Sequence, residues 1–204
     1  MNKPIIQESI IIPFKGARNY VYASDVFQQI IGVLNTNFPN KEIAQIDFST
    51  HKMASSNLEI FVYDNLQNKT DDIQAMFNFT VDGKNYYCII KETGDPINSR
   101  EEYPEEKLYK TFNLDFDKKT IYTTEKYDYS TLDIYTSMNK LLLTNLFSDN
   151  TTGWLSVRVK INKIFAEDYK KLTVKFYKNF ASRYFCSNLF IDEIQIGQLF
   201  FSIK

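Results

Sequence analysis

Apolar residues recur along the chain with two different periods, and each period predicts a different kind of element. The three-to-four-residue spacing of an amphipathic helix occurs twice, and short segments with strand-like alternation fill most of the rest. Helices are predicted over residues 24–38 and 131–147, with Ser24 and Thr131 as N-caps. Strands are predicted over residues 8–15, 43–48, 58–63, 74–80, 85–91, 109–122 (with a turn near 117–119), 155–161, 172–177, 184–191 and 195–203. The pattern therefore predicts an α+β fold rich in antiparallel strands.

Turn residues between these segments indicate which strands pair. Asp82-Gly83 separates two strand-like runs and is a strong signal for a two-residue hairpin. Asp192-Glu193 occupies the corresponding place before the last strand. In residues 155–161 the apolar side chains alternate cleanly with polar ones, which predicts that they share one face of a strand.

The order of elements occurs twice. Residues 20–27 (YVYASDVF) and 127–135 (YDYSTLDIY) share an order of aromatic, hydroxyl, acidic and apolar residues, and each opens a predicted helix. Asp25 and Asp133 are 108 positions apart, and Asp82 and Asp192 are 110 apart. This agreement favours a duplicated unit, although coincidence between two strand-helix-strand patterns is the alternative. We predict a first repeat over residues 1–95, a polar linker over 96–107, and a second repeat over 108–204.

Composition narrows the class of protein. Hydrophobic residues make up 44% of the chain and aromatic residues 16%, which excludes a disordered or fibrous protein. The 24 basic and 25 acidic residues nearly balance, so the chain lacks the excess of cations that nucleic-acid binding requires. We therefore expect no nucleic-acid partner.

The sequence also predicts a cellular setting. The first residues lack the apolar core of a signal peptide, and no apolar run approaches the ~20 residues needed to cross a bilayer. Cys88 and Cys186 fit neither a disulfide framework nor a metal-ligand spacing, and we expect two buried thiols. These features predict a cytoplasmic protein without a membrane partner.

Several catalytic signatures are missing from the sequence. The chain has no G-x-S-x-G elbow, no Walker loop, no Rossmann glycine pattern and no Cys/His cluster with metal-ligand spacing. These absences argue against serine hydrolases, nucleotide-dependent kinases and zinc enzymes. We expect no metal and no cofactor.

One long helix after a first strand, followed by several antiparallel strands within about a hundred residues, resembles a hotdog domain. Two such units in one chain resemble the double-hotdog members of that superfamily, in which each repeat wraps a sheet around a long central helix. The most motif-like piece is residues 19–27 (NYVYASDVF), which is similar to the run that leads into the central helix of thioesterase-type members. The resemblance implies binding of an acyl thioester carried by coenzyme A or by an acyl-carrier protein.

The chain departs from the dehydratase pattern of the superfamily. Dehydratase-type members place a histidine before the central helix, whereas this chain has Tyr20 and Tyr22 there and Tyr127 and Tyr129 in the second copy. The resemblance therefore favours thioesterase-type chemistry, which needs a carboxylate near the start of the helix. Asp25 and Asp133 meet that requirement by position, as catalytic base or, alternatively, as first-turn acids that stabilise the helix dipole.

Three further residues are candidates for the site. Tyr22 is a candidate donor to a substrate carbonyl, and Arg18 is a candidate ligand for a phosphate of coenzyme A. His51 is the single histidine and a candidate proton shuttle. Each residue also has an alternative without a functional role: a tyrosine on a strand, a solvated arginine in a turn, and an exposed histidine.

The sequence thus leaves three functions open. The first is an acyl thioesterase or a related acid-base enzyme, and the second is an inactive hotdog protein that binds an acyl group. The third is a protein-interaction module. A fused pair satisfies the usual dimer of the superfamily, so both a monomer and a homo-oligomer of fused repeats are compatible with it.

Overall fold

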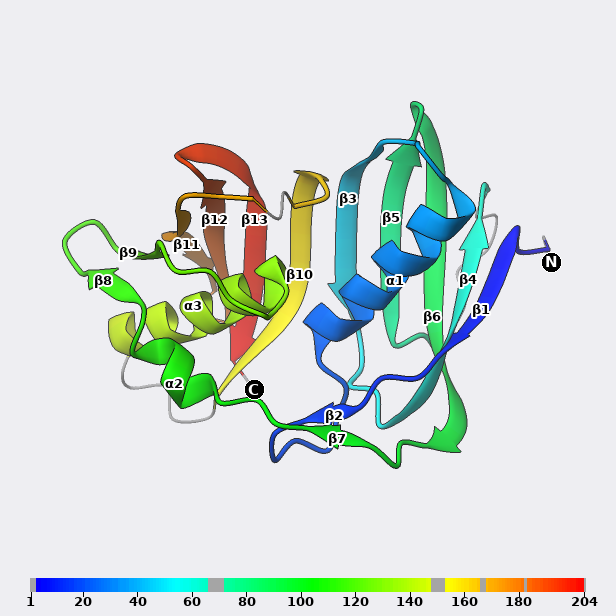
Figure 1. Cartoon of the computed structure of the whole chain (residues 1–204), viewed down its shortest axis with the longest axis horizontal. Coiled ribbons are helices and arrows are strands. Elements are labelled where there is room, and N and C mark those ends of the chain that lie inside the picture. Colours follow the sequence, from blue (N-terminus) through cyan, green and yellow to red (C-terminus); the bar gives the residue numbers. More distant parts are fainter. Residues whose placement is uncertain (1–2, 66–71, 148–152, 166–167, 182, 204) are drawn as a thin grey trace. The chain divides into compact units, whose positions relative to one another are not determined.

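The computed structural model describes residues 3–65, 72–147, 153–165, 168–181 and 183–203. The chain forms two compact units, Met1–Tyr103 and Pro104–Lys204. Figure 1 shows that each unit contains one long helix lying against an antiparallel sheet. The helices predicted over residues 24–38 and 131–147 are confirmed as α1 (Ala23–Asn37) and α3 (Thr131–Leu146).

In the first unit, five antiparallel strands form a sheet in the order β1-β4-β6-β5-β3. These strands are β1 (Ile6–Ile10), β3 (Ile43–Thr50), β4 (Ser56–Tyr63), β5 (Ala75–Val81) and β6 (Lys84–Pro96). Phe27 of α1 packs against Phe77 and Phe48, with ring centroids 5.4 and 5.9 Å apart. The apolar stripe of α1 therefore packs on one face of the sheet and forms the core of this unit.

In the second unit the sheet has the order β10-β13-β12-β11-β9-β8, again antiparallel. Its strands are β8 (Asn113–Asp115), β9 (Thr120–Thr123), β10 (Trp154–Lys163), β11 (Leu172–Phe180), β12 (Tyr184–Ile191) and β13 (Ile194–Ile203). Tyr135 of α3 is fully buried, and its hydroxyl donates to the carbonyl oxygen of Phe190 at 2.8 Å. This bond ties the first half of α3 to the end of β12.

The two sheets differ in strand order, although their elements follow one another in the same sequence. In the first unit β6 lies between β4 and β5, whereas in the second β12 lies between β11 and β13. The lengths of the connections explain the difference. Only residues 181–183 join β11 to β12, so these strands must be neighbours, whereas residues 64–74 separate β4 from β5.

The predicted linker contains regular structure. Within residues 96–107 lie β7 (Arg100–Glu101) and the first part of α2 (Glu105–Tyr109). β7 pairs in parallel with β2 (Phe14–Lys15), and the boundary between the two units falls after Tyr103. The polar sequence thus marks the boundary and also adds a short strand to the first unit.

Both predicted hairpins are confirmed. Val81 pairs with Lys84, and Ile191 pairs with Ile194, so each turn has two central residues. Asp82 and Gly83 have positive φ values of 49° and 78°, as a two-residue hairpin of the primed type requires.

Several local expectations are wrong. Ser24 lies inside α1, whose N-cap is Tyr22, and Ser130 rather than Thr131 caps α3. The predicted strand over residues 8–15 is two strands, β1 and β2. The clean alternation predicted for residues 155–161 is broken by a bulge between Ser156 and Arg158.

The two cysteines are free and buried, as expected from their spacing. Burial raises the pKa of the Cys88 thiol and of the Cys186 thiol above the ordinary range. Both thiols therefore pack as small apolar groups.

Candidate functional site

The start of α1 holds a buried ion pair. Lys15 Nζ donates to Asp25 Oδ1 at 2.5 Å, and 8% and 16% of the two side chains are exposed. Lys15 ends β2, while Asp25 is the acid in the first turn of α1. The predicted candidate Asp25 thus lies against a lysine that the sequence analysis did not select.

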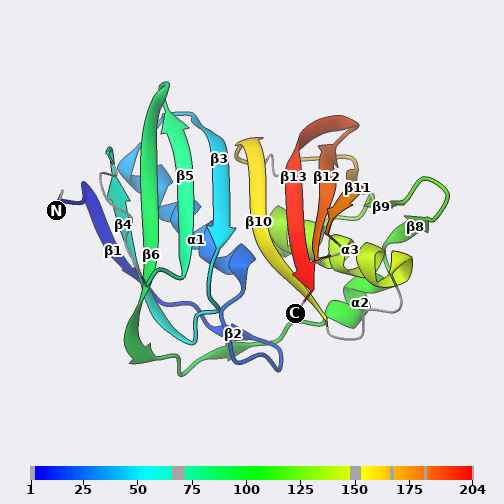
Figure 2. The ribbon, with the colours of Figure 1, turned by 180° about the vertical axis from the view of Figure 1, so that it is seen from behind.

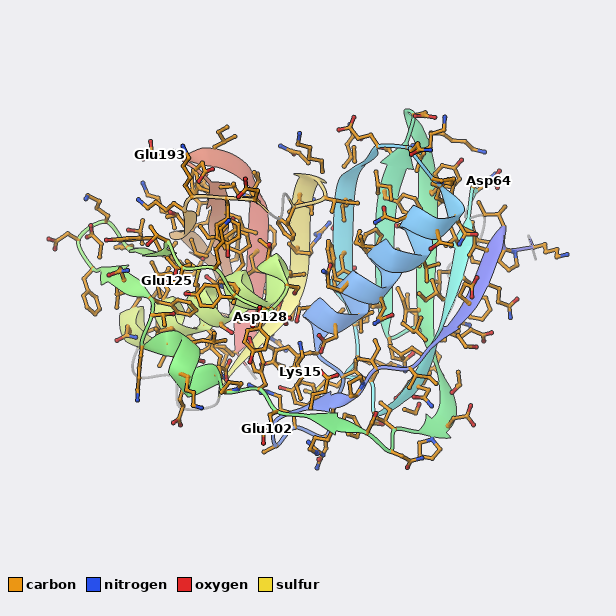
Figure 3. All side chains as sticks on the ribbon, in the orientation of Figure 1. Lys15, Asp64, Glu102, Glu125, Asp128 and Glu193 are labelled. Carbon is orange, nitrogen blue, oxygen red and sulfur yellow. The ribbon has the colours of Figure 1, made fainter. Side chains whose placement is uncertain are left out.

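Tyrosine rings surround the ammonium group of Lys15. Its Nζ lies 5.2 Å from the ring centroid of Tyr103 and 5.8 Å from that of Tyr22. The two tyrosines are each 8% exposed, and their ring centroids are 5.8 Å apart. Ring faces attract a cation, so this arrangement stabilises Lys15 in a site with little water. Figure 3 labels Lys15 on the segment that lies below the first turn of α1.

Arg18 lies on the outer side of the same group. Its guanidinium carbon is 4.5 Å from the ring centroid of Tyr22. Both Arg18 and Lys15 therefore place a cation near the ring of Tyr22. The structure places two of the predicted residues, Tyr22 and Arg18, in one cluster with Asp25.

The loop between β2 and α1 is held in place by Arg100 of β7. Its Nη1 donates to the carbonyl oxygens of Gly16 and Arg18 at 2.5 and 2.7 Å. Gly16 has a φ of 57°, a conformation that glycine adopts without a steric penalty. Because β7 pairs with β2 and Arg100 binds two carbonyl groups of the loop, β7 fixes the positions of Lys15 and of the Arg18 backbone.

The site also contains the first turn of α1. The helix has no side-chain N-cap bond, and the amides of Asp25 and Val26 both donate to the carbonyl oxygen of Tyr22 at 3.1 Å. The amide groups that begin a helix carry a partial positive charge and favour an anion nearby. A lysine, a helix start and a carboxylate therefore lie together within this cluster.

Asp133 has a different environment. It is 3% exposed, its Oδ2 accepts from the Ser130 hydroxyl at 2.9 Å, and its amide donates to the Ser130 Oγ at 3.1 Å. Ser130 is thus the N-cap of α3, and the Asp133 carboxylate accepts a hydrogen bond from its hydroxyl. The contacts favour the structural alternative for Asp133.

His51 lies at the end of β3 and is exposed. Its Nε2 is 3.4 Å from the Ser49 hydroxyl, and its backbone amide donates to the carbonyl oxygen of Gln74 at 2.7 Å. Within the described residues, no contact joins His51 to Asp25 or Tyr22. The structure therefore supports the exposed-histidine alternative.

Sequence reasoning missed Lys15 and Tyr103. A lysine at the end of a strand-like run is usually solvated, and Tyr103 lies in a polar segment that suggested a linker. Their burial depends on contacts between residues more than seventy positions apart, which no local pattern reveals.

Two further facts about the described residues concern metals and membranes. Among them there is no group of three or more His, Cys, Asp or Glu side chains that could hold a metal ion. No helix in the described ranges is both long and apolar enough to cross a membrane.

Comparison with known proteins identifies the fold. No protein-family model and no curated protein matches the chain. Among solved structures, the dehydratase domain of PpsC from Mycobacterium tuberculosis, in complex with C12:1-CoA, is similar with a TM-score of 0.57 at 6% identity, covering 97% of this chain and 92% of that one. The tesB protein of Mycobacterium avium subspecies paratuberculosis has a TM-score of 0.52 at 8% identity, with coverage of 95% and 91%. A protein of Novosphingobium aromaticivorans named as a thioesterase has a TM-score of 0.51 at 10% identity, with coverage of 96% and 93%.

These similarities extend over nearly the whole chain, and the chain has the fold of the hotdog superfamily. The resemblance inferred from element order is thereby confirmed at the level of fold.

Proposed function

We propose that this protein binds an acyl thioester and hydrolyses it. The observation that carries the proposal is the buried Lys15–Asp25 pair at the start of α1, inside a cluster of tyrosines. The fold adds support, because one of the similar structures is a dehydratase domain that holds an acyl-CoA. The acyl carrier is coenzyme A or an acyl-carrier protein.

In the proposed reaction Asp25 is the general base. It removes a proton from a water molecule as the water oxygen forms a bond to the thioester carbon. The negative charge that develops on the carbonyl oxygen is stabilised by the Lys15 ammonium and by the partial positive charge at the start of α1. The carbon–sulfur bond then breaks, the protonated Asp25 gives its proton to the leaving sulfur, and a carboxylic acid and a thiol leave. Tyr22 lines the site, and Arg18 binds a phosphate of the carrier.

A second candidate is an acyl-binding protein without catalysis. Three observations favour it: Asp25 is already held by Lys15, Asp133 is hydrogen-bonded to the N-cap Ser130, and His51 is exposed. In this alternative the ion pair is structural, and the site binds the acyl thioester unchanged.

We also propose that the chain is a double hotdog made of two fused repeats, residues 1–95 and 108–204. Each compact unit contains one long helix and an antiparallel sheet, and the turns at Asp82 and Asp192 occupy the same place before the last strand. In this view the short β11–β12 connection rearranged the second sheet after duplication.

The experiment is a thiol-release assay with a panel of acyl-CoAs and acyl-carrier proteins. Wild type is expected to release thiol, and Asp25→Asn to lose at least about 100-fold in kcat, since general-base catalysis contributes about 10²–10⁴-fold. His51→Gln and Asp64→Asn are controls that should keep wild-type rates, because both residues are exposed.

Lys15→Met tests the role of the ammonium group. A loss of kcat with a small change in KM supports transition-state stabilisation by Lys15. Saturable binding without turnover by wild type would leave the second candidate, and absence of both would reject both proposals.

A further inference from the structure

The hairpin formed by β11 and β12 exposes three aromatic rings. Tyr177, Phe180 and Tyr184 are 55%, 41% and 45% exposed. Most aromatic side chains of this size bury a large part of their surface. Three such rings on one hairpin form an apolar surface patch that the core of the second unit does not use.

Cations accompany these rings. Lys178 Nζ is 5.0 Å from the ring centroid of Tyr177 and 4.6 Å from that of Phe180, and the guanidinium carbon of Arg183 is 5.9 Å from that of Tyr184. Lys175 is exposed on the same strand. Residues 172–191, which form the hairpin, contain three cations and no acid, so this hairpin is basic in a chain whose overall charge is −1.

The strand register sets the direction in which the patch faces. Phe185 packs on Phe147, which ends α3, so Phe185 faces the helix. Tyr184 and Cys186 then point to the other face, and their partners across the ladder are Phe180 and Lys178. Figure 2 shows this side of the second unit, with α3 behind the strands.

We propose that the basic-aromatic hairpin, defined by Lys175, Tyr177, Lys178, Phe180, Arg183 and Tyr184, docks onto the surface of an anionic lipid membrane. Aromatic rings beside lysine and arginine suit the interface of a bilayer, where rings lie at headgroup depth and cations contact lipid phosphates. Such docking is a surface contact and needs no spanning helix. The inference is independent of the acyl chemistry proposed above.

Other occupants fit the observations less well. A specific protein partner needs about 20–30 residues on each side, and this patch is one hairpin. A second copy of the chain would bring like charges together. Single-stranded nucleic acid would stack on the rings, but cations already lie near them, and the chain has no overall positive charge.

The test is co-sedimentation of the full chain with vesicles. One set is phosphatidylcholine alone, and the other contains about one third phosphatidylserine, each in low salt and in high salt. Each cation near an anionic surface is worth roughly a five-fold change in binding. Wild type should therefore bind only the anionic vesicles and be released by salt, which screens charges.

Two hairpin variants separate the contributions. Replacing Lys175, Lys178 and Arg183 by glutamine should reduce binding by roughly 100-fold. Phe180→Ser with Tyr184→Ser should also weaken binding but leave its dependence on salt unchanged. The matched control replaces Lys41, Lys52 and Lys84 by glutamine, which changes the net charge equally but alters exposed lysines of the first unit.

The control variant should bind like wild type, and circular dichroism should show that all variants are folded. Equal loss in the control would overturn the proposal, because binding would then follow net charge alone. No binding by wild type would overturn it as well. So would dimerisation of wild type that the hairpin variants abolish without any vesicle binding.

Discussion

At the scale of single residues, Lys15 and Asp25 are the pair on which the proposed site depends. A buried ion pair is costly to break from one side, because the remaining charge stays in a poorly solvated place. We predict that Lys15→Met destabilises the protein by about 3 kcal/mol and that Asp25→Asn also destabilises it. In a double-mutant cycle the two changes together should cost clearly less than their sum.

Urea denaturation of the four proteins in this cycle measures the coupling. The exposed pair Lys84–Asp64 is the control, and Lys84→Met should change the free energy of unfolding much less than Lys15→Met does, because water screens an exposed ion pair. Additive effects at Lys15 and Asp25 would contradict a coupled pair and would remove the structural basis of the proposed base.

At the residue scale, Glu92 also leads to a prediction of how the stability of the protein depends on pH. Burial raises the pKa of its carboxyl, but donors from Ser55 and Ser56 outweigh burial, and the net pKa is lowered. A lowered folded pKa means that the carboxylate adds stability above the unfolded value of about 4.3. That contribution is lost as pH falls through the folded pKa.

We therefore expect Glu92→Gln to cost about 1–2 kcal/mol at neutral pH, where the native carboxylate accepts these hydrogen bonds. The difference between wild type and variant should narrow below pH about 4. Chemical denaturation at several pH values measures this difference in the free energy of unfolding. A difference that stays constant down to about pH 3 would show that ionisation of Glu92 contributes nothing.

At the scale of elements, replacing each of two glycines by alanine should have opposite effects on stability. A Cβ on Gly197 of β13 would lie 2.1 Å from the backbone oxygen of Lys160, whereas one on Gly32 of α1 would meet nothing within 4 Å. Gly197→Ala should force β10 and β13 apart and cost about 2 kcal/mol or more. Gly32→Ala should stabilise the protein by about 0.5–1 kcal/mol, because alanine favours a helix.

Thermal unfolding of the two variants tests both predictions with the same chemical change. A Gly197→Ala protein as stable as wild type would mean that the close approach of β13 to Lys160 is easily relaxed.

The helices and strands also show which parts of the fold could be predicted from the sequence. Helical spacing located α1 and α3, and Asp82-Gly83 located the β5–β6 hairpin, because these signals are local. The β2–β7 pair and α2 were missed, since two paired residues and a five-residue helix leave no periodic pattern. The strand order of the second sheet was also missed, because residues 181–183 contain no glycine or proline to mark a tight turn.

The candidate site was predictable only in part. Asp25 and Tyr22 were found from the repeated stretch at the start of the helix, and Arg18 from the turn before it. The structure places all three in one cluster. Lys15 and Tyr103 were not found, because each has the local sequence of a surface residue. Their contribution comes from the tertiary contacts that bury a cation between tyrosine rings.

At the scale of the whole molecule, the thermal stability of the protein reports ligand binding even when no catalysis takes place. A ligand that binds only the folded state adds about 2.7 kcal/mol at a hundred times its Kd. For a chain of 204 residues we expect a rise in Tm of about 5–10 °C with a thioether analogue of an acyl-CoA, which cannot be hydrolysed. Coenzyme A without an acyl chain should give a smaller rise.

Asp25→Asn decides between the two candidate functions. If Asp25 is the base, the variant should keep the rise in Tm with the thioether analogue and lose thiol release from the matching thioester, because binding does not require proton transfer. If the protein only binds acyl groups, wild type and variant should show the same rise, and neither should release thiol. A wild-type protein whose Tm no acyl-CoA analogue changes would contradict both, because each function begins with an acyl thioester bound to the folded chain.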